Sequence, residues 1–295
     1  MNKWLLIDGS NLAFRSFYGI AKLSRKDGFA TNAIFGWIKT LWRLEDTFTP
    51  SKVITFFDIS RSHFRQQLFP EYKATRAACP EDLVRQLPFI KEVTRYMGYG
   101  IKQEEGIEAD DLLASTANIL AKKKENVFIV SSDKDLAQCV NSQVSLILPG
   151  TCDTLTSYEV CEQFGVEPSQ MVDLLSLTGD SSDNIPGLPG VGPKPAAKWL
   201  QQYGTIEGIF NSIEGLPQKW APILNENRQL LERNRALIKL KEDCPIDLTQ
   251  EDGLQIQELM GFLEKMELKS LIASAQKRFS LLPDTQKDSQ QMLLF

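Results

Sequence analysis

The chain has 295 residues, 33 Lys and Arg against 38 Asp and Glu, a net charge of −5 and 42% hydrophobic residues, enough for one large or two small globular domains. No apolar run approaches the roughly 18 to 20 residues of a membrane span, so we expect no membrane anchor, no secretion signal and a cytoplasmic location. The single histidine, His63, and five cysteines without a C-x-x-C pair argue against histidine triads, multi-histidine metal sites, disulfide frameworks and thiolate zinc sites.

The first half of the chain alternates short apolar runs with helical patterns. The apolar runs have the length of strands and lack polar alternation, which is typical of strands buried on both faces of a sheet. They cover residues 3–7, 53–57, 127–130 and 144–148, and the helical patterns cover residues 33–44, 80–97 and 109–121. This order predicts an α/β fold over residues 1–156, with a mostly parallel central sheet and helices on both faces.

Residues 59–80 interrupt this rhythm as a long connection between a strand and a helix. Basic side chains interleaved with aromatic ones suit single-stranded nucleic acid, although a solvated loop of long basic side chains has the same composition. We expect the segment to form an arch over the carboxyl edge of the sheet. Its basic residues are Arg61, Arg65, Lys73 and Arg76, its acid is Glu71, and its aromatic residues are Phe64, Phe69 and Tyr72.

The second half, residues 157–280, reads as a helical module. No convincing strand appears there, and the densest Gly and Pro cluster of the chain, residues 187–194, marks a tight turn between helices. The polar tail at 281–295 is expected to be flexible, although it ends in apolar residues. The helical patterns cover residues 159–164, 169–177, 195–202, 225–241 and 256–277.

Acidic residues collect at the predicted ends of strands and starts of helices. Asp8, Asp58 and Asp133 each follow a strand, and the carboxyl ends of parallel strands share one edge of a sheet. We therefore expect the acids to converge there, although residues such as Glu108 and Asp133 also suit helix N-caps. The full set is Asp8, Asp58, Glu108, Asp110, Asp111, Asp133, Asp135, Asp180 and Asp183.

A cluster of this size needs cations. Two like charges about 4 Å apart repel by roughly 4 kcal/mol at an effective dielectric constant near 20. Hard oxygen ligands favour Mg²⁺ or Mn²⁺, and two such ions about 3.5 to 4 Å apart can assist phosphodiester cleavage. Without these nine acids the net charge of −5 becomes +4, so the acidic total does not exclude a nucleic-acid partner.

Seven segments, in this order along the chain, resemble the 5′ nuclease (flap endonuclease) superfamily, and closely the 5′-to-3′ exonuclease domain of bacterial DNA polymerase I. The segments are LLIDGSN at 5–11, FFD at 56–58, FPEYKATR at 69–76, GIEADD at 106–111, SDKD at 132–135, GDSSDNIP at 179–186 and GLPGVG at 187–192. Because no polymerase domain follows, we expect a stand-alone bacterial enzyme.

The resemblance implies a metal-dependent nuclease that takes a 5′ end beneath a helical arch and cuts DNA at the junction of single strand and duplex. Lys73 and Arg76 would contact the scissile phosphate, Tyr72 would stack on a base, and Arg65 is the further DNA contact expected in this segment. The implied first metal site comprises Asp8, Asp58, Glu108, Asp110, Asp111 and Asp133, and the second comprises Asp135, Asp180 and Asp183; Asp8 and Asp58 count, with Lys73 and Arg76, as catalytic residues.

The glycine cluster resembles the family's helix-hairpin-helix element, here near residues 185–203. Such an element grips duplex phosphates, often with a K⁺ ion, and Gly190, Gly192 and Lys194 would make the contacts. Pro193 stands where an acidic or polar residue is common. It also separates Gly192 from Lys194, which excludes a nucleotide-binding loop, whereas a purely structural helix connection stays an alternative.

The end of the tail resembles the bacterial sliding-clamp-binding pentapeptide, with Gln291, Met292, Leu294 and Phe295 as the clamp-contacting residues. Other expected partners are DNA with 5′ flaps, nicks or free 5′ ends, and RNA/DNA hybrids. Two alternatives stay open: a DNA-binding adaptor at the clamp that does not cleave, and a ribonuclease that removes RNA primers. An adaptor, however, has no use for a complete set of carboxylates.

Overall fold

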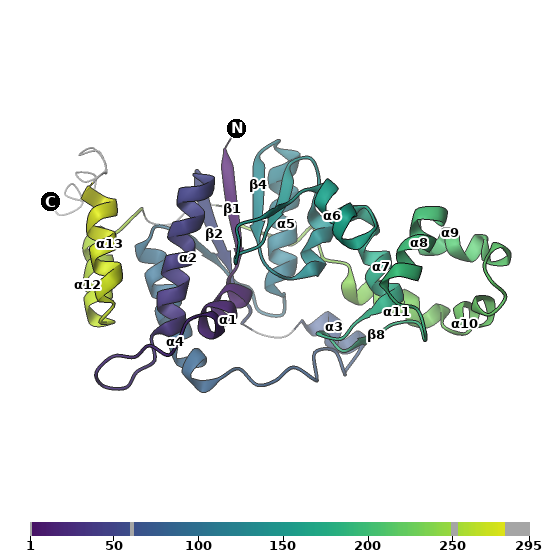
Figure 1. The fold of residues 1–295 in the computed structure, drawn as a ribbon, viewed down its shortest axis with the longest axis horizontal. Helices are drawn as coiled ribbons and strands as arrows, with labels where there is room; N and C mark the ends of the chain where they lie inside the picture. Colours follow the sequence, from purple (N-terminus) through teal and green to yellow (C-terminus); the bar gives the residue numbers. More distant parts are fainter. Residues whose placement is uncertain (1, 60–61, 249–252, 281–295) are drawn as a thin grey trace.

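The computed structural model describes residues 2–59, 62–248 and 253–280. Within these residues, six strands form one sheet in the order β3-β2-β1-β4-β5-β6, parallel except for the β5–β6 pair (Figure 1). The four predicted strands are confirmed, whereas β3 and β6 are too short to leave an apolar pattern. The strands are β1 (Lys3–Asp8), β2 (Lys52–Phe56), β3 (Gly100–Lys102), β4 (Asn126–Val130), β5 (Val144–Ile147) and β6 (Thr154–Leu155).

The central strand β1 explains why the apolar runs lack polar alternation. Leu5 and Ile7 belong to the hydrophobic cluster on one face of the sheet, and Trp4 and Leu6 belong to the cluster on the other. Because helices cover both faces, residues 4–7 of the run are all buried. Strands β2 and β4 lie on either side of β1, so the chain changes direction across the sheet at β1, and ligands bind at the carboxyl ends of strands at such a point.

One face is covered by α1 (Gly9–Gly19), α2 (Asn32–Phe48) and α4 (Glu81–Tyr96), together with the C-terminal pair α12 (Ile256–Lys265) and α13 (Lys269–Ser280). The rings of Tyr96 and Phe262 pack against each other, and Arg278 forms ion pairs with Glu45 and Asp46. We expected the whole of 157–280 to form one helical module. The structure instead places the last two helices on the α/β core.

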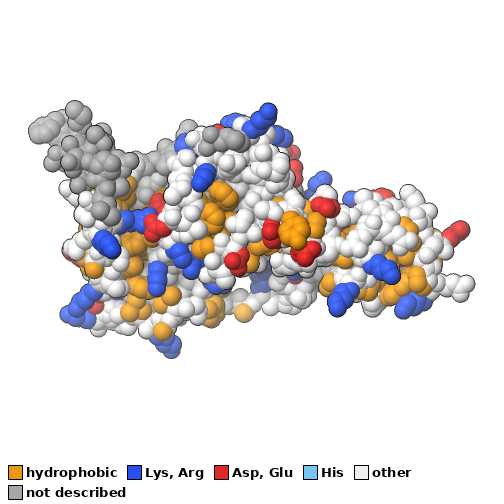
Figure 2. Space-filling model, turned by 45° about the horizontal axis from the view of Figure 1, so that its top comes forward, with side chains coloured by type: hydrophobic (Ala, Val, Ile, Leu, Met, Phe, Trp, Pro, Cys, Tyr) orange, Lys and Arg blue, Asp and Glu red, His pale blue; other side chains and the backbone are white. Residues whose placement is uncertain are grey.

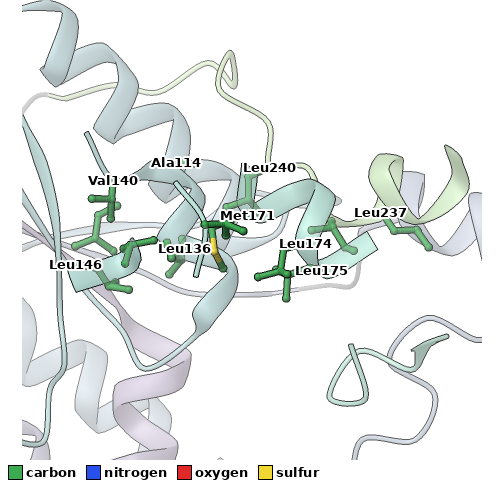
Figure 3. Packing of buried hydrophobic residues seen from close by; sticks show 14 of the residues in the cluster. Ala114, Leu136, Val140, Leu146, Met171, Leu174, Leu175, Leu237 and Leu240 are labelled. Atoms are coloured by element: carbon green, nitrogen blue, oxygen red, sulfur yellow. The ribbon is translucent and has the colours of Figure 1, made fainter. Parts of the chain in front are cut away.

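The other face is covered by α5 (Ala109–Lys122), α6 (Ser157–Phe164) and α7 (Met171–Thr178). Figure 3 shows that buried side chains from α5, β5, α7 and residues 237–240 meet in one cluster, which includes Ala114, Leu146, Met171 and Leu237. The core of the helical module is therefore continuous with the core of the sheet, which holds the module in a fixed place beside the carboxyl edge.

The helical module extends away from the sheet (Figure 1). It continues from α7 through α8 (Pro193–Tyr203), α9 (Ile206–Asn211), α10 (Trp220–Glu226) and α11 (Arg228–Ile238). Two very short strands, β7 (Gly179–Asp180) and β8 (Ile185–Pro186), form a ribbon between α7 and α8 that the sequence pattern did not predict. Among the described residues, no helix has both the length and the apolar character needed to cross a membrane.

The predicted arch is mostly irregular in the described residues. It contains one short helix, α3 (His63–Leu68), followed by a turn and an extended run that leads into α4. In Figure 1 this segment passes from α3 beneath the carboxyl edge of the sheet to α4.

Candidate active site

The first acid of the site ends the central strand. Asp8 is the N-cap of α1, where its Oδ1 accepts a hydrogen bond from the Asn11 backbone N–H at 2.9 Å. Ser131, which directly follows β4, donates to Asp8 Oδ2 at 2.8 Å, so the ends of neighbouring strands are joined. Burial, followed by the charges of Asp133 and Asp58, raises the pKa of Asp8 to about 6.

Asp58 connects the end of β2 to the start of α5. Its Oδ1 accepts from the Ala109 backbone N–H at 2.9 Å and its Oδ2 from Ser10 Oγ at 3.0 Å. The first turn of α5 carries Asp110, which lines the same cavity as Asp58. Burial and the neighbouring negative charges of Asp8 and Asp133 hold the pKa of Asp110 well above its usual range.

Asp133 begins the 3₁₀ helix η1 (Lys134–Cys139) after β4. Its Oδ1 accepts from the Asp135 backbone N–H at 2.9 Å, so the two acids of SDKD are held in adjacent positions. Burial raises the pKa of Asp133, and the charges of Asp183 and Asp180 raise it further. Asp133 therefore lies between the acids of the sheet edge and those of the helical module.

Three further carboxylates meet across the two halves of the chain. Asp135, Asp180 and Asp183 each offer an oxygen, and these oxygens lie within 4.8 Å of one another. Within the described part of the chain, Asp135 Oδ1 is buried without a hydrogen-bond donor. Burial and the neighbouring acids raise the pKa of Asp135 well above its usual value. The unsatisfied oxygen of Asp135 is one that a bound cation could satisfy.

Lys134 partly neutralises the negative charge of Asp180, one of these three carboxylates. Its Nζ lies 2.9 Å from Asp180 Oδ1, and Ser182 also donates to that oxygen through its backbone N–H. Burial opposes ionisation of Asp180, but the hydrogen bonds from Ser182 and Lys134 outweigh it and lower the pKa of this carboxyl.

Lys73 projects from the turn after α3 into the same region. Its Nζ lies 3.1 Å from Glu108 Oε1 and 3.8 Å from Asp183 Oδ2, while the Arg76 guanidinium pairs with Asp183 Oδ1. Burial disfavours the charge on Lys73, but the attraction of Glu108 and Asp183 outweighs it and raises the pKa of the ammonium group. The Lys73 side chain is therefore protonated near neutral pH.

Tyr72 differs from its expected role. We expected this ring to stack on a base, but Tyr72 is only 3% exposed and packs in the hydrophobic core below the site. Its hydroxyl donates to Asp183 Oδ2 at 2.9 Å and lies 3.2 Å from Glu108 Oε2. The ring is taken up by the protein interior, so it has no free face for a nucleotide.

Arg65 and Asp111 also differ from expectation. Arg65, expected on the DNA-facing surface, is 2% exposed and donates to both oxygens of Asp111 at 2.6 and 2.8 Å. Asp111 was expected to bind metal, but it is absent from the cavity lining and is paired with Arg65. Glu108 accepts from Arg65 through Oε2 and from Lys73 through Oε1, so both of its oxygens are engaged by the protein.

The remaining residues enclose a cavity of about 680 Å³. It is lined by four of the acids, Asp8, Asp58, Asp110 and Asp133, and by Lys73 and Arg76. Sequence reasoning did not assign the other polar lining residues, although all of them lie inside the quoted motifs: Ser10, Asn11, Thr75, Ser132, Lys134, Ser181 and Ser182. The cavity is large enough for a phosphodiester with its flanking sugars.

Gly190, Gly192 and Lys194 lie apart from this cavity, at the start of α8. Gly192 is the N-cap of α8 and has no side chain to occupy the free N–H groups there, and Lys194 is exposed. Lys and Arg side chains gather on this projecting part of the molecule, at the right in Figure 2. The expected clamp-binding residues, Gln291, Met292, Leu294 and Phe295, lie outside the described residues.

The sequence matches two family profiles. Residues 3–165 match "5'-3' exonuclease, N-terminal resolvase-like domain", and residues 166–260 match "5'-3' exonuclease, C-terminal SAM fold". A 5'-3' exonuclease of Aquifex aeolicus is 36% identical over 283 residues, which cover 95% of this chain and 97% of that relative. DNA polymerase I of Mycobacterium tuberculosis is 36% identical over 259 residues, and these cover 86% of this chain but only 28% of the polymerase.

Solved structures share the fold. A bacteriophage T5 flap endonuclease, in a pseudo-enzyme-product complex with DNA and metal ions, superposes with a TM-score of 0.68 at 22% identity, covering 93% of this chain and 98% of that one. The catalytic core of Rad2 in complex with a DNA substrate gives a TM-score of 0.61 at 13% identity, with coverage of 100% and 93%. With both profiles and a relative of matching length in agreement, this chain is a member of the 5′-3′ exonuclease family.

Proposed function

We propose that this protein hydrolyses DNA phosphodiesters at 5′ ends and at junctions of single strand and duplex, with two divalent ions, in replication or repair. The observation that carries the proposal is the group of Asp135, Asp180 and Asp183, whose oxygens lie within 4.8 Å beside a cavity that also presents Lys73 and Arg76. Acidic and basic side chains from both halves of the chain meet there. A site that holds an anionic phosphate through metal ions requires both kinds of side chain.

The carboxylates fit two cation sites. Asp8, Asp58, Asp110 and Asp133 line the cavity and would hold the first ion, and Asp135, Asp180 and Asp183 would hold the second. The donor-free Oδ1 of Asp135 supports this assignment, because a buried carboxylate oxygen without a partner is costly unless a cation binds it. Oxygen ligands alone favour Mg²⁺ or Mn²⁺. Ions bound there would lower the pKa of a water molecule and neutralise charge on the reacting phosphate.

Lys73 and Arg76 would bind the scissile phosphate. Both are cations that line the cavity, and both are paired with Asp183 in this structure. If a second ion neutralised Asp183, the two side chains would be available to phosphate oxygens and would stabilise the charge that develops during cleavage. The raised pKa of Lys73 keeps its ammonium group protonated for this purpose.

The start of α8 would grip duplex DNA away from the cut. Backbone N–H groups at a helix N-terminus, with Gly190 and Gly192 allowing close approach and Lys194 adding charge, bind phosphates without reading sequence. A K⁺ ion at this turn is part of the proposal. Pro193 removes one donor, so we expect a contact that relies on the remaining N–H groups and on Lys194.

Two further partners belong to this proposal. RNA/DNA hybrids are expected as substrates because backbone contacts do not read bases. The bacterial sliding clamp is expected to bind Gln291, Met292, Leu294 and Phe295, since tethering raises the local concentration of a nuclease at nicks and flaps. Removal of residues 291–295 should abolish retention on immobilised clamp and leave cleavage of free flap DNA unchanged.

One assay tests the central proposal. Flap, nicked and single-stranded DNA, each labelled at its 5′ end, are incubated with Mg²⁺ or with EDTA, and the products are separated by length. We expect cuts near the junction in Mg²⁺ and none in EDTA. An Asp180→Asn variant should need more Mg²⁺ for the same rate. Cleavage in EDTA, or cuts scattered along single strands without regard to the junction, would contradict the proposal.

A further inference from the structure

A buried ion pair connects three segments that are distant in the sequence. Arg65 lies on α3 and Asp111 in the first turn of α5, and two parallel hydrogen bonds of 2.6 and 2.8 Å join the guanidinium to the carboxylate. The side chains are 2% and 1% exposed. Such a planar, two-bond geometry holds both side chains in one orientation, which a lysine could not do.

The pair also binds the end of the helical module. Arg65 Nε donates to the Leu237 carbonyl at 2.7 Å, near the C-terminus of α11, and a further guanidinium nitrogen lies 3.3 Å from the Lys239 carbonyl. The Lys241 backbone N–H donates to Asp111 Oδ1 at 2.9 Å. The arginine thus occupies carbonyls that the last turn of α11 leaves without helical partners.

In this arrangement, the carboxylate oxygens of Asp111 find hydrogen-bond donors within the protein. Both of its oxygens accept hydrogen bonds from Arg65, and one accepts from Lys241 as well. A metal ion at Asp111 would have to displace a guanidinium whose side chain is only 2% exposed. The preceding residue, Asp110, has a different environment: it lines the open cavity together with Asp8 and Asp133.

The pair lies directly upstream of the phosphate-binding lysine. The Phe69 backbone N–H donates to the Arg65 carbonyl at 2.9 Å and ends α3, and the chain then turns through Tyr72 to Lys73. Arg233, on α11, stacks over the Phe69 ring at 4.2 Å. The other side of the turn is bonded to the β7–β8 ribbon, since the Lys73 backbone N–H donates to the Asp183 carbonyl at 3.0 Å.

We propose that Arg65 and Asp111 are positioning residues that anchor α3 to α5 and α11 and thereby place Lys73 over the metal site, and that Asp111 is not a metal ligand. The consequence for Lys73 rests on the proposed function, whereas the assignment of Asp111 rests on the geometry of the pair. A displacement of about 1 Å in a catalytic group can lower turnover by about a hundredfold. An anchor that fixes the position of Lys73 should therefore have a measurable effect on rate.

Adjacent residues give a matched test. Asp110→Asn and Asp111→Asn remove the same charge from the same helical turn, and each is compared with the wild-type chain. In EDTA, Asp111→Asn should lower the melting temperature because the buried Arg65 loses its two-bond carboxylate partner and keeps the Glu108 contact at 3.2 Å. Asp110→Asn should raise it because it relieves repulsion among the cavity acids. Mn²⁺ titration by calorimetry should give wild-type affinity within about twofold for Asp111→Asn, and at least about a tenfold loss for Asp110→Asn.

Kinetics separate positioning from general stability. On a flap substrate below its melting temperature, Asp111→Asn should lower kcat about tenfold or more with KM nearly unchanged, because duplex binding lies in the helical module. Amide hydrogen exchange should become faster in residues 65–73 and stay at the wild-type rate in α8. Unchanged exchange in 65–73 together with unchanged kcat would overturn the anchoring role.

A second variant covers the case in which Asp111→Asn does not fold. Arg65→Gln/Asp111→Asn replaces the ion pair by two neutral amides and should melt above Asp111→Asn while binding Mn²⁺ like the wild type. Loss of Mn²⁺ affinity in this double variant, or in Asp111→Asn, would show that Asp111 is a ligand and refute the proposal. Wild-type Mn²⁺ affinity in Asp110→Asn would contradict the proposed metal site instead, and the melting temperatures would still decide the anchor.

Discussion

Lys73 is held between Glu108 and the β7–β8 ribbon, with its Nζ 3.1 Å from Glu108 Oε1 and its backbone N–H bonded to the Asp183 carbonyl at 3.0 Å. Its backbone has a φ of +56°, a left-handed conformation that is rare for a residue with a long side chain. Strain of this kind persists where the surroundings determine the conformation, and it is frequent at functional sites. The geometry therefore sets the direction of the Lys73 ammonium group before any substrate binds.

Removal of this ammonium group should act on the rate and not on binding. We expect Lys73→Ala to lower single-turnover cleavage of a 5′-flap substrate by about 10² to 10³, the usual effect of losing one group that stabilises transition-state charge. Lys194→Ala is the control, because Lys194 lies at the start of α8 and should weaken duplex binding with the saturated rate unchanged. Equal rates for Lys73→Ala and wild type would falsify the assignment.

Metal binding should stabilise the fold. Because the ions bind the native carboxylates and not the unfolded chain, Mg²⁺ at 100 times its dissociation constant should add about 2.7 kcal/mol to the free energy of unfolding. Asp135→Asn should melt above the wild type in EDTA, since it removes a buried charge that neighbouring acids repel, and should respond less to Mg²⁺. Thermal melts across a Mg²⁺ titration measure both effects, and an unchanged wild-type melt would count against a preformed site.

The stability of the metal-free protein should depend on pH through Asp8. Its pKa is raised from 3.8 to about 6 by burial, so between these values the native state holds a proton that the unfolded chain releases. This contribution to the free energy of unfolding therefore falls by at most about 3 kcal/mol as pH rises from about 4 to about 6. Above about pH 6 it stays at this lower value. Urea titrations in EDTA at pH 5 and pH 7.5 check it, with Asp8→Asn as the control that should lose this part of the pH dependence.

Gly187 and Gly192 should respond differently to the same substitution. A Cβ at Gly187 would lie 2.3 Å from the carbonyl oxygen of Thr178, whereas a Cβ at Gly192 would meet no atom of the described residues within 4 Å. Gly187→Ala should therefore cost about 1 to 3 kcal/mol of stability and disturb the ribbon that carries Asp180 and Asp183. Gly192→Ala should change stability by less than about 0.5 kcal/mol. If both variants unfold at the wild-type urea concentration, the close approach at Gly187 is wrong.

The sequence alone was sufficient for the central sheet and for the acids at its edge. Fully apolar strands cannot be solvated, so Leu5, Ile7 and their counterparts had to lie between helices, and Asp8 and Asp58 had to follow at one edge. The first helix after β1 escaped prediction because its apolar side chains, among them Phe14 and Tyr18, are partly exposed and blur the helical period. Strand β3 escaped prediction because three residues are too few to show a hydrophobic period.

The tertiary structure alone decided which charges are inside. Arg65 and Lys73 look alike in a basic segment, and Asp110 and Asp111 look alike in one motif, yet one member of each pair is bonded within the interior and the other lines the cavity. The partners that make this difference, such as Leu237 for Arg65, come from distant parts of the chain. The position of α12 and α13 on the α/β core has the same origin, because an amphipathic helix specifies that one side is buried but not against which surface.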